Sequence, residues 1–428
     1  MKLQTNRIPG LVLTDHVFEV PLDYSKPEGE KIEVFGREVV SPANEKKKLP
    51  WLVYLQGGPG FGSPRPIGCN GWMKRALKEF RVFLFDQRGT TTRSTKVNAS
   101  TLNHLSPPEQ AEYLTHFRAD NIVRDAEFIR KKLVGEKWSA LGQSFGGFCI
   151  TTYLSQSPEG LKEAFITGGV PSIVRHIDEV YRETCKFVME KNDVYYKRYP
   201  QDESLVKEIV NYLTENEVLL PCGDRLSARR FLCLGLDLGA QSGYETIHYI
   251  VEQAFEKTAN GIVLSYTFLK EIEQALSFDT HPIFAILHEA IYAQGFSTRW
   301  SADRMLAEYP QFSHDADRVL FTGEMIFRWM FDEFQQLKPL QAAADILAQK
   351  EDWKPLYNPE RFSENEVPVA CAVYYNDMYV NKKYSQETID QTPNMTGWYT
   401  SEYEHCGLRV GGEKLLDRLI GMCRGDVY

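Results

Sequence analysis

The residue that first suggests chemistry is Ser144, which lies between two glycines in the pentapeptide Gly142-Gln143-Ser144-Phe145-Gly146. This G-x-S-x-G pattern is typical of a sharp turn between a strand and a helix, which lifts a serine hydroxyl clear of the backbone. The glycines matter because a residue without a Cβ lets the strand and the helix approach closely. Residues 137–141 can form the strand, and residues 148–154 can form the helix. Ser144 is therefore the predicted nucleophile.

A serine hydroxyl is a weak nucleophile near neutral pH, and it needs a base that a third group orients. When the serine lies in such a turn, an acid and then a histidine follow it in chain order. Asp377 comes just after the apolar run at residues 367–375, where a strand is expected to end. His405 is the only histidine after Asp377, so it is the predicted base. Asp390 and Glu404 are the alternative acids, and acyl transfer is the predicted chemistry.

A glycine-rich turn follows the buried-strand pattern of residues 49–55, in the sequence Gln56-Gly57-Gly58-Pro59-Gly60. Its backbone N–H groups are not covered by side chains, as an oxyanion hole requires of donors that face a developing negative charge. In sites of this kind, one donor comes from an early loop and the other from the residue after the nucleophile. The predicted donors are the N–H groups of Gly58 and Phe145. The alternative is a purely structural turn.

Strand and helix patterns alternate through the first part of the chain. A helical period covers residues 119–133, and strand patterns lie at residues 12–21, 30–40, 49–55, 80–85, 137–141 and 161–167. The first two strands are expected to form an antiparallel pair, and the others to alternate with helices. This alternation predicts an α/β protein with a mostly parallel central sheet flanked by helices. Together with the turn around Ser144, it predicts the α/β-hydrolase fold.

The pattern changes after residue 174. Residues 175–335 contain long helical stretches rich in charge and aromatic rings, such as 180–197, 205–214 and 247–255, and no strand pattern of comparable quality. We therefore predict a helical cap domain at residues 175–335, inserted into the hydrolase core. The first part of that core would be residues 1–174, and the second part residues 336–428.

Composition restricts the class of protein. The chain has 428 residues, 43% hydrophobic and 25% charged, which suits a globular protein with a large core. A net charge of −9 without a long basic run argues against nucleic acid and anionic membranes as partners. No signal peptide or membrane-spanning run is visible, so a cytoplasmic protein is expected. Eight scattered cysteines without metal-ligand spacing predict reduced thiols and neither metal nor cofactor.

Four segments, in their order and approximate spacing, carry a family resemblance. They are Gln56-Gly57-Gly58-Pro59-Gly60, Asp86-Gln87-Arg88-Gly89-Thr90, Gly142-Gln143-Ser144-Phe145-Gly146-Gly147 and Glu404-His405-Cys406-Gly407-Leu408-Arg409. With these segments the chain resembles the proline iminopeptidase, or prolyl aminopeptidase, family of serine peptidases, particularly its longer bacterial and fungal members. Two features depart from the shorter members. Residues 91–94 replace a shorter loop that usually holds a second glycine, and Gln56 stands in place of a histidine.

The resemblance implies an aminopeptidase that releases an N-terminal residue, preferably proline, from peptides with a free N-terminus. It also implies cap carboxylates that bind the substrate's ammonium group, since a charge in a covered site needs a partner. Glu289 and Glu324 are the candidates, because aromatic residues adjoin both. Phe327 and Phe331 would share a helical face with Glu324, where they would line a proline pocket or pack the cap.

The fold alone does not determine the substrate, so other functions stay open. The same triad would serve an aminopeptidase of broader specificity or a carboxylesterase. Outside enzymes, a hydrolase scaffold can be kept as a ligand-binding module. Such a module usually lacks one member of the triad, whereas Ser144, Asp377 and His405 are all present.

Overall fold

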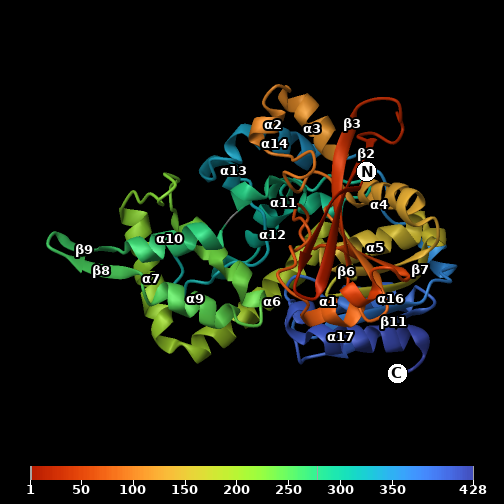
Figure 1. Ribbon diagram of the computed structural model, residues 1–428. Coiled ribbons are helices and arrows are strands. Elements are labelled where there is room, and N and C mark those ends of the chain that lie inside the picture. Colours follow the sequence, from red (N-terminus) through yellow and green to blue (C-terminus); the bar gives the residue numbers. More distant parts are fainter. Residues whose placement is uncertain (1, 277, 428) are drawn as a thin grey trace.

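A large β-sheet forms the centre of the molecule in the computed structural model, which describes residues 2–276 and 278–427 (Figure 1). Within these residues the sheet has nine strands. In chain order they are β1 (Lys2–Ile8), β2 (Leu11–Pro21), β3 (Lys31–Val40), β4 (Trp51–Leu55), β5 (Arg81–Phe85), β6 (Trp138–Gln143), β7 (Leu161–Thr167), β10 (Val369–Tyr374) and β11 (Met395–Thr400).

The order of the strands across the sheet is β1-β2-β3-β5-β4-β6-β7-β10-β11. The pairs from β1 to β5 are antiparallel. The pairs from β5 to β11 are parallel, which confirms the predicted α/β-hydrolase fold. Parallel strands end at the same edge of a sheet, and ligands bind there in open α/β sheets. The loops that follow β4, β6, β7, β10 and β11 therefore meet at one edge.

The helices of the described residues cover both faces of the sheet and fill the segment between β7 and β10. They are α1 (Gly71–Ala76), α2 (Ala99–Leu102), α3 (Pro107–Thr115), α4 (Ala119–Ile129), α5 (Phe145–Gln156), α6 (Ile177–Arg198), α7 (Pro200–Glu215), α8 (Ala228–Leu232), α9 (Gly243–Val251), α10 (Tyr266–Ala275), α11 (Pro282–Leu287), α12 (Ser301–Leu306), α13 (Met330–Glu333), α14 (Gln341–Gln349), α15 (Pro359–Ser363), α16 (Lys382–Asp390) and α17 (Gly407–Arg424). None of them is long and apolar enough to cross a lipid bilayer.

The sheet separates two apolar cores, one on each of its faces. Alternate residues of β4 show the division: Leu52 and Tyr54 pack in a core with α1 and α17, whereas Val53 and Leu55 pack in the core that contains α4 and α5. Because both faces are covered, the central strands are buried throughout and appear in the sequence as continuous apolar runs. The strands that position the site were therefore predictable.

The segment between β7 and β10 is mainly helical, and Figure 1 shows α7, α9 and α10 on the side of the molecule away from the sheet. The boundaries that we placed after residues 174 and 335 remain a prediction. The segment also holds two short strands that the sequence analysis did not identify, β8 (Phe255–Thr258) and β9 (Gly261–Leu264), which form a hairpin that projects outward (Figure 1). Both strands have only four residues and are largely exposed, and the apolar stretch Ile262-Val263-Leu264 of β9 is too short to mark a strand. Asn260-Gly261 was the turn signal that could have revealed them.

The two edge strands, β1 and β11, were also not predicted. Each pairs with a single neighbour, β1 with β2 and β11 with β10. An edge strand is partly exposed and needs few apolar residues, as Thr396, Tyr399 and Thr400 in β11 illustrate. Sequence patterns that depend on burial therefore missed both edges of the sheet.

Candidate active site

Ser144 lies between the end of β6 and the start of α5. Its backbone has φ 55° and ψ −126°, values that a residue other than glycine rarely adopts. The turn needs glycine at position 146, where the helix approaches β4 closely: a Cβ on Gly146 would lie 1.9 Å from the carbonyl oxygen of Leu55. The N–H of Ser144 donates to the carbonyl of Thr167 (3.0 Å), which ties the turn to β7. The G-x-S-x-G segment thus forms a tight turn above the middle of the sheet.

Asp377 and His405 lie together at the same edge. Asp377 follows β10, His405 follows β11, and Nδ1 of His405 is 2.7 Å from Oδ2 of Asp377. Oδ1 of Asp377 accepts hydrogen bonds from the N–H groups of Tyr379 (2.9 Å) and Val380 (3.0 Å). The aspartate is thus fixed by its own loop and in turn orients the imidazole. Burial lowers the pKa of His405, but the charge of Asp377, the hydrogen bond to Asp377 and the charge of Glu324 together outweigh this effect, and the pKa is raised overall.

The two alternative acids have other partners. Oε2 of Glu404 accepts a hydrogen bond from Nζ of Lys191 (2.7 Å). Asp390 accepts a hydrogen bond from Gln386, four residues earlier on α16. Among the carboxylates that the structure describes, Asp377 is the one bonded to His405.

A pair of glycines after β7 contacts both the serine and the histidine. A Cβ on Gly169 would lie 2.2 Å from the carbonyl oxygen of Ser144, and a Cβ on Gly168 would lie 3.2 Å from Nδ1 of His405. Larger residues at these positions would push the two segments apart. Ser144 and His405 also line the same cavity, which has a volume of about 400 Å³. The structure therefore brings together the three side chains predicted from chain order.

The walls of this cavity come from distant parts of the chain. The sheet side contributes Gln56, Gly57, Gly58, Phe61, Gln143, Ser144, Tyr379, His405, Cys406 and Arg409. The segment between β7 and β10 contributes Leu236, Asp237, Gly239, Ala240, Ala275, Phe278, His281, Phe284 and Glu324. A concave site with apolar walls and a few polar groups suits a small ligand.

The glycine-rich turn lies beside the serine. A Cβ on Gly57 would come within 2.9 Å of the Cβ of Ser144, and Gly58 lines the cavity. Phe145 is the first residue of α5, directly after Ser144. The backbone segments that carry Gly58 and Phe145 therefore lie next to Ser144.

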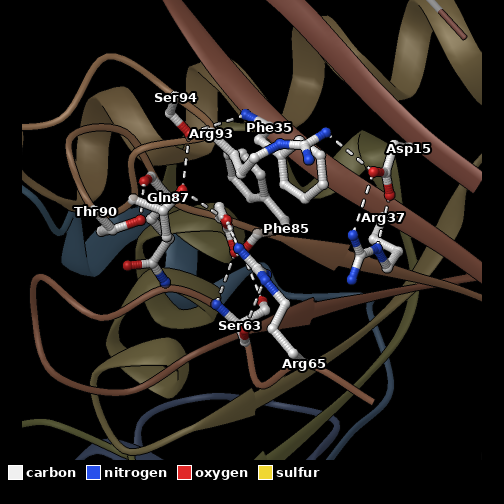
Figure 2. Close-up of polar contacts among 12 residues, drawn as sticks. Asp15, Phe35, Arg37, Ser63, Arg65, Phe85, Gln87, Thr90, Arg93 and Ser94 are labelled. Atoms are coloured by element: carbon white, nitrogen blue, oxygen red, sulfur yellow. Dashed lines mark hydrogen bonds and ion pairs between the residues drawn. The ribbon is translucent and has the colours of Figure 1, made fainter. Parts of the chain in front are cut away.

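Asp86 and Gln87 hold the glycine-rich loop at both ends. Nε2 of Gln87 donates to the carbonyl of Gln56 (2.9 Å), where the loop begins. Farther along, the N–H of Ser63 donates to Oδ1 of Asp86 (2.9 Å), and the guanidinium of Arg65 bonds both oxygens of that carboxylate. Figure 2 shows Ser63 and Arg65 side by side near Phe85, the residue before Asp86. Sequence reasoning missed both anchors, although their place directly after the buried strand β5 was a usable signal.

A cluster of arginines adjoins this anchor. The ring of Phe35 lies 4.8 Å, 5.3 Å and 5.6 Å from the guanidinium carbons of Arg93, Arg65 and Arg37 (Figure 2). The loop at residues 91–94, where the chain departs from shorter family members, is part of this arrangement. Its Thr91 donates through Oγ1 to Asp86 (2.8 Å). The loop is thus fixed by polar contacts where a second glycine is absent.

Glu324 lines the cavity together with Ser144 and His405, and it is half-buried. Burial raises the pKa of its carboxyl to about 7, although the nearby His405 acts in the opposite direction. The predicted helix around Glu324 is wrong, because α13 starts only at Met330. Phe327 and Phe331 therefore do not share a helical face with Glu324, and both rings are buried in the apolar core. The Gly323 position before Glu324 favours irregular backbone, which interrupts the apparent helical period.

Glu289 is not among the residues that line the cavity. Its carboxylate is buried and accepts hydrogen bonds from the N–H groups of Ser301 (3.1 Å) and Ala302 (2.9 Å). These are the first two residues of α12, so Glu289 satisfies free donors at a helix N-terminus. Burial raises the pKa of Glu289 to about 7, and the backbone hydrogen bonds counteract part of this rise. The structure thus separates the two glutamates that the sequence grouped together.

Asp237 is a cavity residue that sequence reasoning missed. It lies in the 3₁₀ segment η4 (Cys233–Gly239), and burial raises its pKa to about 6. Its neighbours Leu236 and Leu238 are apolar. A lone carboxylate between leucines was the only signal, and many acidic residues of the chain share such surroundings.

Comparisons with known proteins identify the relatives of this chain. A family model described as alpha/beta hydrolase fold matches residues 50–202. The chain is 49% identical over 420 residues to a proline iminopeptidase of Aeromonas sobria, covering 97% of this chain and 98% of that protein. It is 36% identical over 416 residues to a proline iminopeptidase of Aspergillus aculeatus, covering 95% and 92%. A solved proline iminopeptidase of Mycobacterium smegmatis is 14% identical with a TM-score of 0.46, covering 96% of this chain and 100% of that chain.

Proposed function

Because the chain belongs to the proline iminopeptidase family of α/β-hydrolase serine peptidases, we propose that it removes N-terminal proline from peptides with a free N-terminus. One observation carries the proposal: a single cavity is lined by Ser144, by His405 and by the carboxylate of Glu324. A nucleophile with its base performs acyl transfer, and a carboxylate beside them binds a cation. An aminopeptidase needs both at a short separation.

In the proposed mechanism, Ser144 attacks the carbonyl of the N-terminal residue while His405 accepts the proton of the hydroxyl. Asp377 holds the imidazole in the required tautomer and stabilises the imidazolium that forms. The N–H groups of Gly58 and Phe145 bind the oxyanion of the tetrahedral intermediate. His405 then gives its proton to the leaving amine of the shortened peptide. Water activated by the same His405 hydrolyses the acyl-enzyme and releases the amino acid.

We assign the substrate's ammonium group to Glu324 rather than to Glu289. Glu324 faces the cavity, whereas both oxygens of Glu289 are engaged by the backbone of α12. A substrate ammonium beside Glu324 would favour the ionised carboxylate and lower its raised pKa. Phe61, Phe278 and Phe284 supply an apolar wall for a pyrrolidine ring in the same cavity.

The cytoplasmic location stays a prediction from the sequence.

A panel of chromogenic substrates tests the proposal. The wild-type enzyme should hydrolyse prolyl anilide faster than alanyl anilide, and should not hydrolyse N-acetylprolyl anilide. Ser144→Ala should lose turnover and should not react with a fluorophosphonate probe that labels the wild type. Equal rates on free and acetylated anilides would exclude ammonium recognition. Faster turnover of a short acyl ester than of any anilide would favour a carboxylesterase instead.

A further inference from the structure

Arg409 is the one lysine or arginine among the described residues that line the cavity. It lies in the first turn of α17, four residues after His405, and its side chain is exposed at the cavity wall. The contacts of the described residues include no ion pair, ring contact or side-chain hydrogen bond of its guanidinium. Most other arginines near the site are engaged, as Arg65 is with Asp86. A permanent positive charge at this wall is thus available to a ligand.

Arg409 and Glu324 are two charged groups of opposite sign near the imidazole of His405, and they come from different parts of the fold. The negative charge of Glu324 contributes to raising the pKa of Tyr379, of Tyr292 and of His405. The positive charge of Arg409 acts in the opposite direction on the pKa of His405 and on that of Tyr54, which belongs to β4. His405 is the neighbour that they share. Glu324 belongs to the helical segment between β7 and β10, whereas Arg409 belongs to α17, which packs against the sheet.

This arrangement matches the charges of a short peptide. With its ammonium group at Glu324 and its first carbonyl at Ser144, a peptide would occupy the cavity whose wall also carries His405 and Arg409. Each further residue extends the chain by at most about 3.3–3.6 Å, so the carboxylate of a dipeptide or tripeptide stays near the cavity. The planar guanidinium of arginine binds a carboxylate through two parallel hydrogen bonds. Asp237 and Glu324, the other charged groups of the wall, would repel that carboxylate.

Building on the proposed function, we propose that Arg409 binds the C-terminal carboxylate of the substrate and selects short peptides with N-terminal proline. A longer peptide places its carboxylate beyond the reach of Arg409, and a peptide amide has no negative charge to offer. Because Arg409 is exposed, water and salt weaken the pair. The expected preference for acid over amide is therefore about twofold to fivefold in kcat/KM, as for ion pairs at exposed sites.

The test compares Pro-Gly with Pro-Gly amide by the rate of proline release, at a pH where both have a charged amine. The measured quantity is the ratio of kcat/KM for acid to kcat/KM for amide within each enzyme, so differences in overall activity cancel. The wild type should prefer the acid, and Arg409→Gln should bring the ratio to about one. Arg409→Lys should restore part of the preference. Raising the salt concentration to about 1 M should reduce the wild-type ratio.

Arg361→Gln is the matched control, because Arg361 is also exposed but lies in α15, outside the cavity. It should keep the wild-type ratio. An unchanged preference in Arg409→Gln, or no preference in the wild type, would overturn the inference. Prolyl anilide separates this outcome from failure of the proposed function. An enzyme that cleaves the anilide but treats acid and amide alike refutes only the role of Arg409.

Discussion

Nδ1 of His405 lies 2.7 Å from Oδ2 of Asp377, although the two residues follow different strands and are 28 positions apart in the chain. The contact assigns Nδ1 as the donor to the carboxylate, which leaves Nε2 to exchange protons with a serine hydroxyl. The aspartate is itself held by two backbone N–H groups of its loop. The orientation of the His405 imidazole thus depends on a short chain of hydrogen bonds that ends at the backbone.

Asp377→Asn should reduce kcat by about 10³- to 10⁴-fold, because an amide in this position favours the wrong tautomer of His405. Asparagine has nearly the same volume, so the loop should keep its structure and the thermal midpoint should change little. Asp390→Asn is the control, since Asp390 is exposed on α16 and bonds Gln386 instead. Steady-state kinetics on prolyl anilide measure the effect. A loss of less than tenfold would contradict the role of Asp377.

Glu324→Gln should reduce kcat/KM for free-amine substrates by about 100-fold or more, because the substrate's buried ammonium loses its ionic partner. Glu289→Gln is the comparison variant, since Glu289 bonds the N-terminus of α12 and does not line the cavity. Its effect should appear in thermal stability rather than in the preference for a free amine. Kinetics with prolyl and N-acetylprolyl anilides distinguish the two. A larger loss of amine preference in Glu289→Gln would reverse our assignment.

The pH dependence of kcat/KM should show two deprotonations on its acid side. Burial raises the pKa of Glu324 to about 7, and Asp377 raises that of His405. In the proposed mechanism the active form has an ionised Glu324 and a neutral His405, so both groups must lose a proton. Activity should therefore fall as the pH decreases through about 7, with a limiting slope near two in a logarithmic plot.

The Glu324→Gln variant provides the check on this profile. It lacks one of the two titrating groups, so its acid limb should have a slope near one. Asp237, with a pKa of about 6, faces the same cavity and would add its effect only at lower pH. Rates on prolyl anilide between about pH 5 and pH 9 give both profiles. Equal slopes in the two enzymes would contradict ionisation of Glu324 as a requirement for binding.

Asp86→Asn should lower kcat more than it raises KM, because the loop that carries Gly58 would lose its anchor at Ser63 and Arg65. A displacement of about 1 Å at a reacting centre can reduce the rate about 100-fold, so a loss of 10- to 100-fold is expected. Asp15→Asn is the matched control. Asp15 is also buried and pairs with two arginines of the same cluster, Arg37 and Arg93, but does not contact the glycine-rich loop. Equal kinetic losses in both variants would indicate a general effect on stability.

The parts of the molecule that could be predicted from sequence are those with local causes. The tight turn at Ser144 is specified by neighbouring glycines, and β4, β5, β7 and β10 are specified by their buried apolar runs. Chain order then left His405 as a single candidate. The edge strands and the projecting hairpin were not predicted, because they are too exposed to have a buried apolar pattern.

The remaining site residues depend on contacts between distant segments. Glu289 and Glu324 have similar aromatic neighbours in sequence, yet one caps a helix and the other faces the cavity. Asp237 reaches the cavity because η4 passes over the edge of the sheet, and no local pattern indicates that path. Asp86 and Gln87 were visible as a family motif, but their bonds to Ser63 and Gln56 required the structure.

The backbone of Ser144 has a final consequence. A residue other than glycine held at φ 55° and ψ −126° costs roughly 1–3 kcal/mol, so glycine at this position would favour the folded state. Stability and turnover therefore oppose each other at residue 144. Selection for heat resistance alone, without selection for turnover, would favour Ser144→Gly, and the site would then lose its hydroxyl first.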